Sequence, residues 1–156
     1  LGLLADVDLP AAAEALESFY QRWRNEPLVV DKWFRVQALS RREDTLERVR
    51  ALTTHPAFEL RNPNKVRALI GAFCHQNPAL FHDPSGAGYA FLTESVLKLD
   101  AINPQIAARL VAALSRWRRY EPQRAQLMRE SLTRISAAPN LSTDVYEVVA
   151  RSLEPA

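Results

Sequence analysis

Residues 62–73 read NPNKVRALIGAF, and this stretch carries the pattern that decides the fold. Asn62 can accept a hydrogen bond from a free backbone amide, and Pro63 suits the first turn of a helix. The apolar residues that follow are spaced i, i+3, i+4 and i+7, which places them on one helical face. They are Val66, Leu69, Ile70 and Phe73. The stretch therefore predicts a helix that begins after Asn62 and buries one side.

Helical periodicity of this kind runs through the rest of the chain, for example at Ile106, Leu110, Ala113 and Trp117. No comparable stretch alternates apolar and polar residues as a half-buried strand does. Prolines, glycines and capping residues divide the pattern into about eight helices. We expect these helices at residues 10–24, 27–39, 43–54, 63–75, 86–100, 104–118, 122–137 and 143–153.

The helix starts repeat a capping device. Asn77 and Asn103 each precede a proline, as Asn62 does. Ser40-x-x-Glu43 has the form of a capping box and is expected to open the third helix. Ser142 can cap the last one.

Short helices joined by tight turns pack as antiparallel neighbours, and a chain of such pairs builds a superhelix. The predicted fold class is therefore all-α, an irregular superhelix of about eight antiparallel helices that resembles HEAT or armadillo arrays. The length of 156 residues suits a single helical domain over 1–156, or two tightly packed halves. Because no residue pattern recurs at a fixed period, a compact orthogonal bundle is the alternative.

Composition and charge exclude little beyond disorder. The chain is 47% hydrophobic, and its net charge of +2 is too balanced to indicate a nucleic acid or membrane partner. No uninterrupted apolar run reaches the length of a membrane span. The single cysteine, Cys74, cannot form an internal disulfide, and we expect a cytoplasmic protein. Because the chain begins at Leu1 and its only methionine is Met128, we expect a fragment of a longer protein.

No complete catalytic or metal-binding motif is present. The sequence lacks His-Glu-x-x-His, and Cys74, His75 and His82 do not have the spacing of a standard zinc site. We expect capping or surface histidines, and a buried apolar Cys74 rather than a nucleophile. Gly86-Ala87-Gly88 lacks the lysine and hydroxyl residue of a phosphate-binding loop, so it is interpreted as the turn that starts a helix near Tyr89.

The cluster Arg116-Trp-Arg-Arg-Tyr120 mixes cations with aromatic rings. Side chains of this kind can bind the phosphates and bases of single-stranded nucleic acids. A solvated helix end explains it better, because cations are favourable at helix C-termini. A nucleic-acid module remains a third hypothesis for function, and strongly salt-dependent binding would be its signature.

Three donors near helix starts are candidate site residues: Arg67, Gln105 and Arg109. Gln105 and Arg109 are one turn apart and lie beside the apolar stripe, so both side chains face outward. Helix N-termini and guanidinium groups together suit a carboxylate or peptide carbonyls. On the residues alone, ordinary surface salt bridges are the simpler interpretation.

Several long stretches are similar to the C-terminal helical domain of bacterial aminopeptidase N, a family of zinc metallopeptidases also called alanyl aminopeptidases. The likeness rests on LVVDKWF at 28–34, NPNKVRALIGAF at 62–73, GYAFL at 88–92 and NPQIAARL at 103–110. It continues through Arg119-Tyr120, Leu141-Ser142 and Tyr146-Glu147, and so covers nearly the whole chain in order.

The resemblance implies the terminal domain of a longer enzyme that removes N-terminal residues from peptides. The zinc, its ligands and the catalytic residues would all lie upstream, so this chain would hold no cofactor and be inactive alone. Its partners would be the catalytic domain of the same chain and peptide substrates, with a superhelix closing over the catalytic chamber.

The resemblance also places Arg67, Gln105 and Arg109 at positions that look toward the chamber. Lys65 replaces an arginine found in some relatives, and Trp33, Phe34 and Tyr89 are assigned to packing. A free-standing helical-repeat scaffold that binds a protein partner is the alternative.

Overall fold

The computed structural model describes residues 1–155, and within them every regular element is a helix and none is a strand. The predicted all-α class is confirmed. No helix within residues 1–155 is long and apolar enough to cross a bilayer. The helices group into two compact units, Leu1–Leu80 and Phe81–Ala156.

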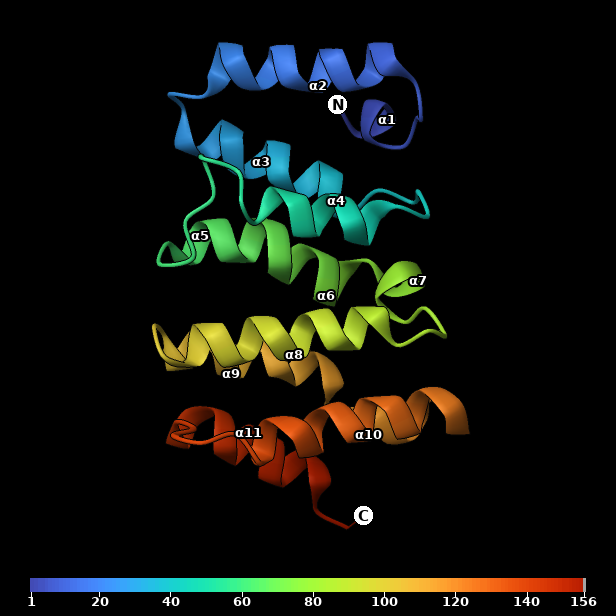
Figure 1. Cartoon of the computed structure of the whole chain (residues 1–156), viewed down its shortest axis with the longest axis vertical. Coiled ribbons are helices and arrows are strands. Elements are labelled where there is room, and N and C mark those ends of the chain that lie inside the picture. The colour runs from blue at the N-terminus through green and yellow to red at the C-terminus, as the bar shows by residue number, and fades with distance from the viewer. Residues whose placement is uncertain (156) are drawn as a thin grey trace. The chain divides into compact units, whose positions relative to one another are not determined.

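The first unit is a succession of helices that pack on their neighbours in sequence. In Figure 1, α2, α3, α4 and the run from α5 to α6 follow one another as layers from the blue end, and contacts join each layer to the next. The bounds are α1 (Gly2–Ala5), α2 (Pro10–Trp23), α3 (Pro27–Ala38), α4 (Thr45–Leu52), α5 (Pro63–Val66), the π-helical segment η1 (Arg67–Gly71) and α6 (Ala72–Gln76). The short α7 (Pro78–Phe81) follows.

The core of the first unit forms around the apolar face of α3. Trp33 is 3% exposed, and its indole Nε1 donates to the carbonyl of Leu16 at 2.9 Å, which ties α3 to α2. Phe34 is fully buried and packs edge-to-face against Trp33. The stripe predicted from residues 62–73 completes this core, because Leu69 and Phe73 are fully buried. The packing roles predicted for Trp33 and Phe34 are confirmed.

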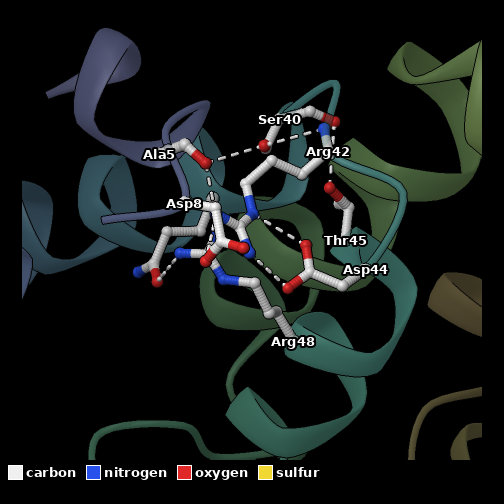
Figure 2. Close-up of polar contacts among 8 residues, drawn as sticks. Ala5, Asp8, Ser40, Arg42, Asp44, Thr45 and Arg48 are labelled. Atoms are coloured by element: carbon white, nitrogen blue, oxygen red, sulfur yellow. Dashed lines mark hydrogen bonds and ion pairs between the residues drawn. The ribbon is translucent and has the colours of Figure 1, made fainter. Parts of the chain in front are cut away.

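Polar contacts hold the N-terminal segment against the connection between α3 and α4, as Figure 2 shows. The carbonyl of Ala5 accepts from Ser40 Oγ at 2.8 Å and from Arg48 Nη1 at 2.9 Å. The Arg42 guanidinium forms an ion pair with Asp8 at 3.1 Å. It also donates hydrogen bonds to both carboxylate oxygens of Asp44, at 2.7 and 2.5 Å. The segment is therefore part of the folded unit.

The prediction of a capping box at Ser40 is wrong, because the N-terminal segment occupies its side chain. The Ser40 hydroxyl donates to Ala5, and α4 begins at Thr45 with no side-chain cap. Asn77 also departs from its predicted capping role, since its amide donates to the carbonyls of Ala38 and Ser40 at 3.0 and 2.9 Å.

The second unit contains two long helices and two shorter ones. In Figure 1, α8 lies along α9, and α10 lies beside both α8 and α11, in agreement with the contacts between them. Fully buried side chains from these helices, among them Leu92, Leu99, Met128 and Val149, form the core. The bounds are α8 (Ala87–Asp100), α9 (Pro104–Val111), the 3₁₀ turns η2 (Ala112–Leu114) and η3 (Trp117–Arg119), α10 (Pro122–Ser136) and α11 (Thr143–Leu153).

Two predicted helices are interrupted. The helix expected over 104–118 ends at Val111, and 3₁₀ turns replace its second half. That path buries Leu114 completely, and it brings the Trp117 indole to the carbonyl of Ser152 at 2.9 Å. The helix expected over 63–75 is interrupted by η1, whose π-helical turns separate α5 from α6.

Candidate functional site

Arg67 lies on the exposed side of the junction between α5 and η1. Its Nε donates to the carbonyl of Pro63 at 3.3 Å, and its Nη2 donates to Asn64 Oδ1 at 3.2 Å. The predicted cap is present beneath it, because Asn62 Oδ1 accepts from the amide of Asn64 at 3.0 Å. The arginine therefore belongs to a short, internally braced turn.

Lys65 anchors this turn to α3. It is only 7% exposed, and its ammonium group binds Asp31 Oδ1 at 2.5 Å and the carbonyl of Pro27 at 3.0 Å. A buried charge is tolerated where partners replace its water, as they do here. Lys65 points inward and Arg67 outward, so the two neighbouring cations have different tasks.

Gln105 and Arg109 lie one turn apart on α9, and both are exposed. The predicted cap of this helix is confirmed, since Asn103 Oδ1 accepts from the amide of Ile106 at 3.2 Å. Neither side chain forms a hydrogen bond or ion pair with any of residues 1–155. The salt bridges that the residues alone suggested for Arg109 are therefore absent from the described part of the chain.

The structure places α9 firmly, because its opposite face is buried. Ile106, Ala107, Leu110 and Val111 pack against α8 and α11. Arg67 belongs to the first unit, and Gln105 and Arg109 belong to the second. In each unit the candidate side chains lie on a packed helix and are exposed at the surface.

Cys74 is buried, and burial raises the pKa of its thiol far above the ordinary value. A thiol that stays protonated is a poor nucleophile. The interpretation as an apolar core residue is confirmed. No group of three or more His, Cys, Asp or Glu side chains within residues 1–155 is arranged to hold a metal ion.

His82 links three segments of the second unit, which sequence reasoning did not foresee. Its Nδ1 lies 2.7 Å from the hydroxyl of Tyr89 and its Nε2 lies 3.0 Å from the hydroxyl of Tyr120. Arg124 donates to its backbone carbonyl at 2.6 Å. Burial, and then the charge of Arg124, lower the pKa of His82, while burial raises the pKa of Tyr89 to about 12. Both ring nitrogens are occupied, so the role is structural.

The cluster at 116–120 is mostly committed to the fold. Trp117 and Arg118 both donate to the carbonyl of Ser152 at 2.9 Å, and Arg118 also reaches the carbonyls of Leu153 and Glu154. These contacts cover the C-terminal carbonyls of α11, where a cation is also electrostatically favourable. The hydroxyl of Tyr120 contacts His82. Trp117, Arg118 and Tyr120 therefore all have partners within the fold, although each could have bound a nucleic acid.

The turn at Gly86 starts α8 as predicted, although the helix begins at Ala87. Gly86 has a left-handed φ of +78°, which glycine adopts without strain. A Cβ at Gly88 would lie 2.2 Å from the carbonyl oxygen of Phe81, so α8 passes against that backbone. Both glycines serve packing and chain direction.

Comparison with known proteins identifies relatives for nearly the whole chain. Residues 1–154 match the family described as "Domain of unknown function (DUF3458_C) ARM repeats". The chain is 59% identical over 140 residues to an aminopeptidase N of Caulobacter vibrioides and 42% identical over 145 residues to that of Escherichia coli, alignments that cover 90% and 93% of it.

A solved structure is also similar. The crystal structure of Legionella pneumophila aminopeptidase A in complex with aspartic acid matches 97% of the chain with a TM-score of 0.90 and 38% identity. The chain spans only 16%, 17% and 18% of the length of these three relatives. The matches confirm the resemblance to the helical domain of bacterial aminopeptidase N.

Proposed function

The chain belongs to the family of DUF3458_C ARM-repeat domains, and from this membership we propose that it is the C-terminal helical domain of a zinc-dependent aminopeptidase. The enzyme removes N-terminal residues from peptides, and this domain covers its catalytic chamber and controls access and substrate binding. The observation that carries the proposal is the 59% identity to an aminopeptidase N across 90% of the chain.

The division of labour follows from the residues present. We assign the zinc and its chemistry to the catalytic domain of the same enzyme, as the resemblance to zinc aminopeptidases implies. This chain contributes shape and hydrogen-bond donors. We place the enzyme in the cytoplasm, and the single buried thiol of this chain fits a reducing compartment.

Arg67, Gln105 and Arg109 are proposed to contact the peptide away from the bond that is cut. Each is exposed on a helix whose other face is packed, and an arginine offers several N–H donors to a carbonyl or carboxylate. A contact of this kind stabilises the bound substrate and the transition state to the same degree. Its loss therefore raises KM and leaves kcat nearly unchanged.

The test is Arg109→Ala in the full-length enzyme, with kinetics on peptides of increasing length and on an aminoacyl anilide. We expect KM for peptides to rise about tenfold or more, as for a lost charge-assisted hydrogen bond, and the anilide to be affected least. Arg116→Ala is the control, because Arg116 is also exposed and its side chain has no partner within residues 1–155. An unchanged KM at every peptide length would refute the role of Arg109.

A further inference from the structure

The contacts of Arg67 restrain one edge of its guanidinium group. Nε and Nη2 form that edge, and they donate to the carbonyl of Pro63 and to Asn64 Oδ1. The other edge, formed by Nη1 and Nη2, keeps N–H donors that no group in residues 1–155 accepts. That edge has the fork geometry that binds a carboxylate through two hydrogen bonds.

Asn64 is itself held in place from both sides. Its backbone amide donates to Asn62 Oδ1 at 3.0 Å, and the next residue, Lys65, is anchored by Asp31 and Pro27. The Asn64 side chain is exposed, and its Oδ1 accepts a hydrogen bond from the Arg67 side chain. The backbone that carries the Asn64 amide is thus held in place, and the amide oxygen accepts from Arg67 one helical turn away.

The backbone changes at the residue that carries the guanidinium. Arg67 is the first residue of η1, whose next three residues, Ala68, Leu69 and Ile70, are buried. π-Helical turns are rare and occur often at functional sites. Within this turn the apolar side chains are buried and Arg67 is exposed.

We propose that Asn64 is a positioning residue for substrate binding, which acts by holding the Arg67 guanidinium with its free edge toward the carboxylate or carbonyl oxygens of a peptide. This inference rests on the proposed function, because it requires Arg67 to contact substrate. A free arginine side chain loses rotamer freedom on binding, and a braced one has already lost it. Asn64 therefore lowers KM without touching the peptide.

The experiment is a double-mutant cycle in the full-length enzyme with Asn64→Ala, Arg67→Ala and both together. We expect Asn64→Ala to raise KM for peptides about three- to tenfold, the effect of one hydrogen bond, with kcat little changed. In the double variant KM should match that of Arg67→Ala, because Asn64 has no effect once the arginine is gone. KM for an aminoacyl anilide, which lacks a second peptide bond and a carboxylate, should not change.

A control is available at the C-terminal end of α2. Gln21 Oε1 accepts from Arg24 Nη1 at 3.3 Å, also three residues apart and exposed. Gln21→Ala removes this contact, together with the hydrogen bond that Gln21 Nε2 donates to Glu17 at 2.7 Å. This variant should leave KM unchanged.

The outcomes separate the two proposals. If Arg67→Ala raises KM but Asn64→Ala does not, or if the two effects add in the double variant, positioning by Asn64 is refuted and substrate binding by Arg67 stands. If Asn64→Ala impairs the anilide and the peptides equally, its role is structural and the inference fails. If Arg67→Ala leaves KM unchanged for every peptide, the substrate role of Arg67 fails, and the inference fails with it.

Discussion

Lys65 is nearly buried, and its ammonium group binds the carboxylate of Asp31 and the carbonyl of Pro27. Its partner Asp31 is 34 residues away in sequence. No local spacing connects the two residues, and the sequence showed Lys65 only as a substitute for an arginine. The ion pair illustrates why the surroundings of the candidate site could not be predicted: its bracing comes from tertiary contacts.

The half-buried histidines make the stability of the chain depend on pH. Burial lowers the pKa of His55 and of His82 below the ordinary value of 6.5, and the charge of Arg124 adds to the effect on His82. In the unfolded chain both return to the ordinary value, so below that pH the unfolded state binds more protons. Their contribution to stability is therefore fully present above pH 6.5 and is lost as the pH falls through the lowered native pKa values.

Urea denaturation between pH 7.5 and 5.5 checks this prediction. The free energy of unfolding should decrease toward pH 5.5, and a variant with His55→Gln and His82→Gln should lose less over the same interval. The ring C–H resonances of both histidines should titrate below pH 6.5 in the native protein. Native midpoints at or above 6.5 would contradict the prediction.

The close passage of α8 over the backbone of α7 depends on Gly88. Any side chain at this position would meet the Phe81 carbonyl oxygen at 2.2 Å, and a backbone atom cannot move aside as a flexible side chain can. We expect Gly88→Ala to lower the free energy of unfolding by about 3 kcal/mol or more, in the upper range for overpacking. Chemical denaturation measures the change.

Gly71→Ala is the matched control within the first unit. The nearest atom that its Cβ would meet is the carbonyl oxygen of Val66 at 3.7 Å, an ordinary contact. Stability should stay within about 1 kcal/mol of the parent chain, because alanine is also the better helix former. Similar losses in the two variants would show that the close approach at Gly88 is unimportant.

Helix starts show which parts of an element can be predicted from local sequence. Asn62, Asn103 and Ser142 cap as expected, since each bond joins residues two or three positions apart. Ser40 fits its motif equally well, yet its hydroxyl donates to Ala5, 35 positions earlier. The early end of α9 has a similar cause, because Trp117 finds its partner in α11. Local signals fail where a distant backbone group competes for the same side chain.

For the whole molecule, apolar periodicity was enough to predict the fold class, since most residues that repeat at helical spacing, such as Leu69, Phe73 and Leu110, are buried in the two cores. The candidate site was not accessible in the same way. Arg67, Gln105 and Arg109 are exposed polar residues on amphipathic helices, as many surface residues are. Only the resemblance to a peptidase domain distinguished them, because the chemistry that we propose for them lies outside residues 1–155.

For the molecule as a whole, we predict that the chain depends on another domain for catalysis. A hydrolase of the proposed type needs a metal and a group that activates water, and residues 1–155 bring no set of metal ligands together. The purified chain, shown by circular dichroism to be helical, should therefore not hydrolyse an aminoacyl anilide even with added zinc. The full-length enzyme should hydrolyse it, lose activity to a chelator and recover with zinc. Turnover by the isolated chain that survives removal of contaminating peptidases would refute the assignment of catalysis to another domain.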